Sequence, residues 1–310
     1  MKGILMPSVS HSEVDSYLLC RRKHYYGYGL SLQRVKESSS LATGVAGHKI
    51  LETFYRTILE AGITVEEQKA AFEKAATDAA DAYFELVKEG YEDGDRRAKL
   101  ADILFHEDYG YFENEFFVNK GWRILAVEAE YNLVYDDDTQ ASYPFVVDLV
   151  VQDPDGAYVV IDHKFVYDFY SPESTDLQPQ IPKYIGALRA LGHEVSYGGY
   201  NMLRTRKTKE TTPESNNYFM ILKPNATRIT TTFMEQLGVA SEIQALKELP
   251  LDVQEKRAYR TANKMICQSC SFRDLCSTEL MGGNVELMKK TEYKIRERKE
   301  FALPTEMSTE

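Results

Sequence analysis

The stretch that decides the fold reads Phe145-Val-Val-Asp-Leu-Val-Val151, then Asp153-Pro-Asp-Gly156, then Tyr158-Val-Val-Ile-Asp-His-Lys-Phe-Val166. The first and third segments are short, β-branched and aromatic, and this composition predicts two mostly buried β-strands. The segment between them has the residues of a tight turn. The stretch therefore predicts a β-hairpin.

Both predicted strands carry charges, namely Asp148 in the first and Asp162 and Lys164 in the second. An isolated charge in a strand core is costly unless it is paired or bound to a metal. Because side chains alternate faces along a strand, Asp162 and Lys164 point the same way. If a five-residue connection pairs Gln152 with Tyr158, Asp148 lies opposite Asp162 on that face. A four-residue loop would place the two aspartates on opposite faces.

Two carboxylates and a lysine on one sheet face form a site for a hard divalent cation with a cationic group beside it. The alternative is a buried salt bridge in which Lys164 neutralises one aspartate. The residues of the hairpin alone leave both interpretations open.

The composition bounds the class of protein. The chain has 310 residues, 43% hydrophobic and 12% aromatic, which indicates a globular protein with a sizeable core. Its formal charge of −11 argues against coating nucleic acid with the whole surface but leaves room for a local basic groove. No apolar run approaches the ~20 residues of a membrane span, and no signal peptide is evident. We therefore expect a cytoplasmic protein that does not enter membranes.

The chain has four cysteines, Cys20, Cys267, Cys270 and Cys276. The last three follow a C-x2-C-x5-C pattern, which is too tight for two ordinary disulfides. This spacing is typical of metal or cluster ligation.

The periodicity changes along the chain. We expect one domain over residues 1–300, with a helical insertion at about 62–120 and a catalytic core at about 121–224. A C-terminal helical and cysteine-containing region should cover about 231–300, and residues 301–310 should form a flexible tail.

A helix from about Val45 to Ala61 is predicted upstream of the hairpin, with His48 at the edge of its core stripe. The start of this helix includes the small residues Gly44, Ala46 and Gly47, so another group can approach His48 closely. The alternative is that His48, which lies beside the core stripe, is only packed there and is not a metal ligand.

A second helix, from about Gln178 to Leu191, follows the hairpin. Gln180 and Tyr184 are one turn apart and therefore lie side by side. Pro179 and Pro182 are compatible only with its first turn.

Two basic segments are candidates for contact with DNA phosphates. Arg21 and Arg22 lie in a basic run on an N-terminal helix expected to continue to about Gly27, and Arg204, Arg206 and Lys207 follow a predicted strand. A solvated helix end and a solvated loop are the alternatives.

In this order, the features resemble the RecB-like branch of the PD-(D/E)XK nucleases with an iron–sulfur staple, which includes the AddB nuclease domain and CRISPR-associated and phage RecB-like exonucleases. The resemblance covers most of residues 8–280. The matching segments are Ser8 to Tyr26 with Cys20, Gly44 to His48, Asp148, Asp162-His-Lys164, Gln180 to Tyr184, and Cys267, Cys270 and Cys276. Two departures are Arg21, where relatives often have proline, and the prolines around Gln180.

The resemblance implies an α/β fold with a restriction-endonuclease-like core, that is, a central mixed β-sheet flanked by helices. A helical insertion and a four-cysteine region that joins the two ends would be added to this core. The implied activity is that of a metal-dependent DNA exonuclease acting on single strands or duplex ends in recombination or repair. A catalytically silent DNA-binding subunit is the alternative from another class, and an endonuclease-like trimming subunit is a third. Any unwinding would come from a helicase or recombination partner.

The resemblance also implies roles for individual residues. The implied ligands of Mg2+ or Mn2+ are His48, Asp148, Asp162 and the backbone carbonyl of His163, with Glu128 or, equally, Glu130 in support. The imidazole favours Mn2+. Lys164 would orient or help deprotonate the attacking water, and Gln180 and Tyr184 would position the DNA backbone or the lysine. The four cysteines would bind a [4Fe–4S] cluster, with Zn2+ as the alternative because it takes the same number of thiolates.

Overall fold

A computed structural model describes residues 8–35, 39–88, 94–136, 138–139, 141–175, 177–206 and 211–296. They divide into two compact units. Unit 1 comprises the described residues within 1–38, 131–145 and 234–303, and unit 2 those within 39–130 and 146–233. Lys207 and the predicted tail at 301–310 lie outside the described residues.

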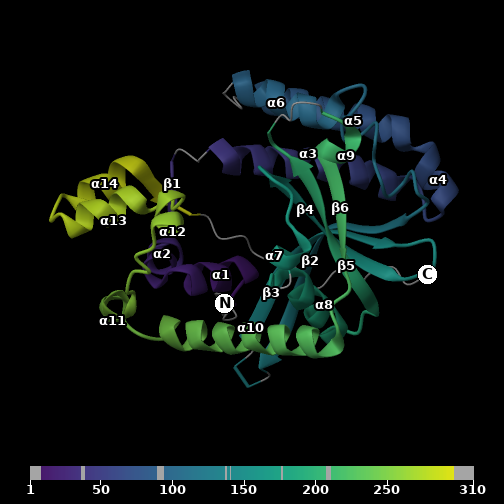
Figure 1. Ribbon diagram of the computed structural model, residues 1–310. Helices are drawn as coiled ribbons and strands as arrows, with labels where there is room; N and C mark the ends of the chain where they lie inside the picture. Colours follow the sequence, from purple (N-terminus) through teal and green to yellow (C-terminus); the bar gives the residue numbers. More distant parts are fainter. Residues whose placement is uncertain are drawn as a thin grey trace, which may run out of the picture. The chain divides into compact units, whose positions relative to one another are not determined.

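A five-stranded sheet in the order β2-β3-β4-β5-β6 forms the centre of the fold (Figure 1). The strands are β2 (Arg123–Asp136), β3 (Ala141–Gln152), β4 (Tyr158–Val166), β5 (Val195–Arg204) and β6 (Asn217–Leu222). β4 pairs antiparallel with β3 and parallel with β5, and β5 pairs antiparallel with β6. The central mixed sheet flanked by helices is therefore confirmed.

The β3–β4 hairpin has the register that places its charges on one face. Gln152 is paired with Tyr158, and the ladder continues to Leu149 opposite Ile161. The pairing ends there, and Asp148 and Asp162 are the next residues along this register, on the same face by the alternation of side chains. Gly156 in the connection has a φ of +86°, a conformation that glycine adopts at little steric cost.

Helices cover both faces of β4. One face belongs to the core of α3 (Ser39–Ala61), where Ile50, Leu51, Phe54 and Ile58 meet Leu149, Val151, Val159 and Ile161. The other face carries α8 (Gln180–Ala190), the crossover between the parallel strands. A Cβ atom on Gly198 would lie 2.7 Å from side-chain atoms of both Ile181 and Val160. The close seating of α8 on the sheet therefore requires a glycine there.

The remaining elements of unit 2 are mostly helical. They are α4 (Val65–Ala70), α5 (Phe72–Lys88), α6 (Gly94–Phe105), α7 (Pro172–Thr175), α9 (Pro213–Asn216) and the start of α10 (Ala226–Lys247). Within the predicted helical insertion, helix ends at Phe105, and residues 106–121 form turns that bury Tyr111, Phe112 and Phe117.

Unit 1 contains short elements. These are α1 (His11–Leu19), α2 (Arg21–His24), the π-helical η1 (Tyr25–Gly29), β1 (Leu32–Arg34), α11 (Leu251–Arg257), α12 (Lys264–Gln268), α13 (Arg273–Leu280), α14 (Val285–Glu292) and β7 (Tyr293–Ile295), with the end of α10. The N-terminal helix that we expected to be continuous is interrupted at Cys20, which has an extended backbone with φ −165° and ψ 116°. The cysteine therefore lies at a joint between two helices.

A buried charge cluster ties the helices of unit 1 together. The Glu13 carboxylate lies 2.9 Å from His24 Nε2 and accepts a hydrogen bond of 2.8 Å from Lys247 Nζ. Burial opposes ionisation of Glu13, but the hydrogen bond to His24 and the charge of Lys247 outweigh it, so its pKa is lowered. No helix in the described part of the chain is both long enough and apolar enough to cross a membrane.

Candidate active site

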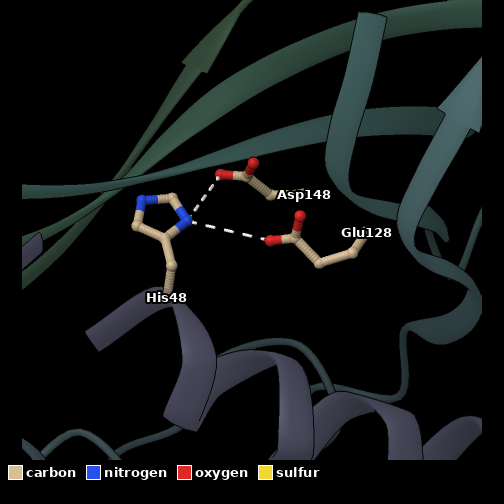
Figure 2. A group of neighbouring side chains, drawn as sticks. All are labelled: His48, Glu128 and Asp148. Carbon is tan, nitrogen blue, oxygen red and sulfur yellow. Dashed lines mark ion pairs between the residues drawn. The ribbon is translucent and has the colours of Figure 1, made fainter. Parts of the chain in front are cut away.

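Three side chains with metal-ligand chemistry converge in unit 2: His48 from α3, Glu128 from β2 and Asp148 from β3 (Figure 2). His48 Nδ1 lies 3.4 Å from Asp148 Oδ2 and 3.9 Å from Glu128 Oε1. One ligand atom from each of the three residues lies within 4.8 Å of the other two. Among the described residues, no other set of three His, Cys, Asp or Glu side chains converges so closely. An imidazole and two carboxylates in this arrangement can hold a divalent cation.

The backbone brings two of these groups to the site by unusual means. Glu128 has a φ of +46°, a left-handed conformation that non-glycine residues rarely adopt within a strand. On α3, a Cβ atom at Gly47 would lie 2.1 Å from the ring of Phe165. The bare glycine thus lets the start of α3 approach β4 and places His48 beside the carboxylates.

Asp162 and Lys164 form an ion pair on the α8 side of β4, with Nζ 2.6 Å from Oδ2. Gln180 Nε2 donates to Asp162 Oδ1 at 2.6 Å and to the Tyr184 hydroxyl at 3.2 Å. Burial lowers the pKa of Lys164, but the charge of Asp162 outweighs burial and the pKa is raised. The salt bridge considered as an alternative therefore exists, and it involves Asp162 rather than Asp148.

The electrostatics of the site favour a bound cation. Burial, and then the charge of Asp162, raise the pKa of Asp148 to about 7. Burial lowers the pKa of His48, but the neighbouring carboxylates of Glu128, Asp148 and Asp162 raise it overall. Asp162 Oδ2 is buried and has the Lys164 ammonium group as its partner. The donor set of one imidazole and two carboxylates at the convergence point fits a divalent ion.

The structure thus brings together most of the residues singled out in the sequence. His48 and Asp148 are in one group, and Glu128 joins them. Asp162 lies outside that group of three, held by Lys164 and Gln180. The pattern of alternating residues did not distinguish Glu128 from Glu130, because it carries no sign of the left-handed backbone at 128.

The four cysteines are free thiols in unit 1. In the described residues, no three of their sulfurs lie within 4.8 Å of one another. Zinc–sulfur bonds of about 2.3 Å in a tetrahedron would place the sulfurs roughly 3.8 Å apart. The expected four-cysteine site is therefore not formed as a tight zinc cage.

The cysteine sulfurs have polar neighbours in the loop before α12. The Thr261 N–H donates to Cys20 Sγ at 3.5 Å, and Arg260 Nε donates to Cys276 Sγ at 2.8 Å. Burial raises the pKa of the Cys270 thiol, and the charges of Cys20 and Cys267 raise it further. Cys20 and Cys267 thus act electrostatically on Cys270, but the sulfurs do not gather around one point.

Arg21 and Arg22, expected as phosphate contacts, have partners within unit 1. The Arg21 guanidinium lies 4.1 Å from the centroid of the Tyr17 ring. Arg22 is only 12% exposed and lies 3.6 Å from each of Glu255 and Glu279. Contact of Arg22 with DNA would require these partners to be replaced.

In unit 2, the basic segment after β5 is also partnered. Arg206 Nε donates to Asp168 Oδ1 at 2.7 Å, and the Arg204 guanidinium lies 4.1 Å from the centroid of the Phe169 ring. Both arginines therefore make contacts without a nucleic acid.

Comparisons with known proteins point to one family. The family model for the PD-(D/E)XK nuclease superfamily matches residues 8–277. No curated protein matches the chain. Among solved structures, "Crystal structure of SSO0001" is 11% identical, with 85% of this chain and 95% of that chain covered and a TM-score of 0.28. A likeness at this TM-score and identity says nothing about function.

Proposed function

The chain belongs to the PD-(D/E)XK nuclease superfamily, and we propose that it is a divalent-metal-dependent deoxyribonuclease that degrades DNA from its ends. Membership of the superfamily suggests phosphodiester hydrolysis and a nucleic acid substrate. The observation that carries the proposal is the convergence of His48, Glu128 and Asp148 on one point.

The proposed cation is Mg2+ or Mn2+. His48, Glu128 and Asp148 would hold it, and Asp162 and the backbone carbonyl of His163 are the further ligands expected from the family resemblance. A bound divalent ion activates water and offsets the charge that develops on the phosphoryl oxygens. The imidazole nitrogen shifts the preference of the site towards Mn2+.

Lys164 and α8 supply the remaining groups. Because its pKa is raised, the Lys164 side chain is an ammonium group in the metal-free protein, suited to orienting a water molecule and offsetting negative charge. Gln180 donates to Asp162 and to the Tyr184 hydroxyl, so it fixes the carboxylate next to the lysine. Gln180 and Tyr184 would position the DNA backbone or the lysine.

The finer proposal is an exonuclease of the RecB-like type, acting in the cytoplasm on single strands or duplex ends in recombination or repair. The alternative is a catalytically silent DNA-binding subunit. A silent subunit has no need of a histidine, three carboxylates and a lysine in one place, and this favours the enzyme. A helicase or recombination partner would supply any unwinding.

We also propose that the four cysteines bind a [4Fe–4S] cluster. The iron and sulfide atoms of such a cluster lie between the thiolates, so its ligand sulfurs are farther apart than those around a single zinc ion. The four thiols of unit 1 fit the cluster in number and in chemistry. The cluster would hold residue 20 next to residues 267–276.

The test uses an anaerobic preparation and DNA labelled at the 5′ or the 3′ end, single- or double-stranded, with Mg2+, Mn2+ or EDTA. We expect progressive shortening from an end with Mn2+ or Mg2+, none with EDTA, and broad visible absorption from the cluster. Binding of DNA without cleavage under all metal conditions would support the silent subunit instead.

A further inference from the structure

A series of hydrogen-bonded, buried polar side chains lies on the α3 side of β4, the strand that carries Asp162 and Lys164. His163 stands between Asp162 and Lys164 in β4, but its side chain points to the opposite face of the sheet, towards α3. There it is 3% exposed, and its ring stacks on Tyr55 with centroids 5.6 Å apart and an interplanar angle of 9°. Its Nδ1 lies 2.9 Å from Nδ2 of Asn201 on the neighbouring strand β5.

The hydrogen bonds continue from Asn201 away from the sheet. Asn201 Nδ2 also donates to the Tyr111 hydroxyl at 2.8 Å, and that hydroxyl is hydrogen-bonded to the hydroxyl of Tyr55. Tyr55 in turn donates to Glu115 Oε1 at 2.7 Å. All five side chains belong to residues that are at most 3% exposed. We call this set, His163, Asn201, Tyr111, Tyr55 and Glu115, the buried polar chain.

Glu115 anchors the far end of the buried polar chain. Its carboxylate accepts backbone N–H groups of Phe117 and Val118, each at 2.8 Å, and of Asn119 at 3.3 Å. Its partners in the described part of the chain are a tyrosine hydroxyl and backbone N–H groups, with no cationic side chain among them, and burial raises the pKa of Glu115 to about 7. A buried carboxylate without a cationic partner is costly, and apolar residues would fill the same space more stably. Stability alone therefore does not account for this arrangement.

The anchor determines where each proton of the buried polar chain lies. When Glu115 is ionised, its carboxylate only accepts, so Tyr55 donates to Glu115 and Tyr111 donates to Tyr55. The oxygen of Tyr111 is then left to accept, so the amide group of Asn201 must turn its NH2 towards it. The second amide hydrogen points to His163 Nδ1, which can only accept. The imidazole of His163 is therefore neutral, with its proton on Nε2.

The near end of the buried polar chain reaches the candidate metal site through one peptide group. The backbone N–H of His163 donates to Asp148 Oδ2 at 2.8 Å, the same oxygen that lies 3.4 Å from His48 Nδ1. The rings of His163 and His48 also meet edge to face, with centroids 6.2 Å apart. The position of His163 thus affects two proposed ligands, Asp148 through the backbone N–H and His48 through the ring contact.

We propose that Asn201 is a positioning residue for the cation site: by donating to both Tyr111 and His163, it holds His163 as the neutral Nε2–H tautomer and fixes the peptide that orients the Asp148 carboxylate. This inference rests on the proposed function in so far as the site binds a divalent cation. Asn201 itself touches neither the cation nor the substrate. It acts through His163.

The first test needs no metal and no substrate. Nitrogen-15 NMR of the metal-free protein at pH 8.5, where Glu115 is ionised, reports the tautomer of His163, assigned with a His163→Gln variant. We expect an unprotonated Nδ1 in the natural sequence. Asn201→Asp has the same shape but can only accept, so we expect it to move the proton of His163 to Nδ1. A protonated Nδ1 in the unaltered protein would overturn the inference.

The second test measures the dissociation constant of Mn2+ by electron paramagnetic resonance. Asn201→Leu removes both donors at similar volume and should weaken Mn2+ binding about tenfold, as loss of an orienting partner does at other metal sites. The matched control is Asn216→Leu, another buried asparagine of unit 2, which donates to the carbonyls of Ile103 and Tyr109 and is not part of the buried polar chain. Its Mn2+ affinity should be unchanged even if it lowers stability.

The outcomes distinguish the positioning role of Asn201 from the proposed nuclease function. If the unaltered protein binds Mn2+ and cleaves DNA while folded Asn201→Leu binds Mn2+ equally well, the positioning role is refuted and the proposed function stands. If the unaltered protein neither binds Mn2+ nor cleaves DNA, the proposed function fails, and the cation-positioning role fails with it. If Asn201→Leu does not fold, the tautomer of His163 and the dissociation constant of Mn2+ are both measured on Asn201→Asp, and an unchanged Mn2+ affinity with a changed tautomer refutes the positioning role.

Discussion

The two proposed metal-binding regions differ in how their ligands are held. His48, Glu128 and Asp148 lie on α3, β2 and β3, which have 23, 14 and 12 residues. These long elements, with the core beneath them and a left-handed backbone at Glu128, bring the three ligand atoms within 4.8 Å of one another.

The cysteines belong to much shorter segments. Cys20 lies between α1 and a four-residue helix, and Cys267 is in the five-residue helix α12. The sulfurs do not gather as a single metal ion requires. If both proposals hold, the sheet pre-organises the carboxylate site without an ion, whereas the proposed cluster would have to draw the cysteines together.

The largest effect should come from Lys164→Ala. We expect the rate of cleavage to fall about 10³-fold, because a positioned charge that acts in the transition state is lost, while Mn2+ binding persists. The assay is release of labelled nucleotides, with Lys74→Ala on the exposed face of α5 as the control. Undiminished cleavage by a pure Lys164→Ala preparation would remove the lysine from the mechanism.

The substitution Cys20→Ala tests whether the four cysteines bind a cluster. If a cluster joins residue 20 to residues 267–276, its loss should abolish bound iron and lower the melting temperature by about 5 °C or more. Ser269→Ala, between two of the cysteines, serves as the control and should change neither. Unchanged iron content and melting temperature in Cys20→Ala would refute the staple.

Two substitutions, Glu128→Gln and Glu130→Gln, test which of these glutamates is a ligand of the proposed metal site. Glu128 contributes an oxygen to the candidate metal site, so its substitution should raise the dissociation constant of Mn2+ about 10- to 100-fold. Glu130 lies two residues farther along β2, outside the group, and its substitution should leave Mn2+ affinity nearly unchanged. Calorimetric titration distinguishes the two, and equal losses would show that the group has been assigned wrongly.

A smaller effect is expected on stability as a function of pH in the metal-free protein. The pKa of Asp148 is about 7 in the folded protein against 3.8 as its ordinary value. The folded state therefore holds a proton that the unfolded state has lost, and the free energy of unfolding falls as pH rises from about 4 to about 7. Asp148→Asn removes this penalty, so it should be more stable than the natural sequence by about 1–2 kcal/mol at pH 8 and not at pH 4.

The measurement is urea unfolding in EDTA at both pH values. Asp155→Asn, an exposed position in the turn of the same hairpin, is the control and should show no such dependence. A stability difference between Asp148→Asn and the natural protein that is the same at pH 4 and pH 8 would contradict an elevated pKa.

The hairpin and its charged face could be predicted from the sequence because two simple rules suffice. Side chains alternate along a strand, and the five-residue connection sets which residues are paired, so Asp148, Asp162 and Lys164 were expected on one face. The slim start of α3 similarly indicated that His48 would be approached closely, and Phe165 does lie against Gly47.

Other features depend on information that local patterns do not carry. The choice of Glu128 over Glu130 follows from a left-handed backbone at a residue that is not glycine. The buried polar chain joins residues of α3, the turns after α6, β4 and β5, and nothing local signals that His163 and Asn201 meet. The extended backbone at Cys20 interrupts a stretch whose residues favour a continuous helix.

The most direct test of the central claim is pulsed electron paramagnetic resonance of Mn2+ added to the protein labelled with nitrogen-15 histidine. We expect a bound Mn2+ ion to be coupled to an imidazole nitrogen, and His48→Gln to remove the coupling and weaken binding. Absence of Mn2+ binding to the unaltered protein, or a coupling that persists in His48→Gln, would contradict the claim that His48, Glu128 and Asp148 form the metal site of this nuclease.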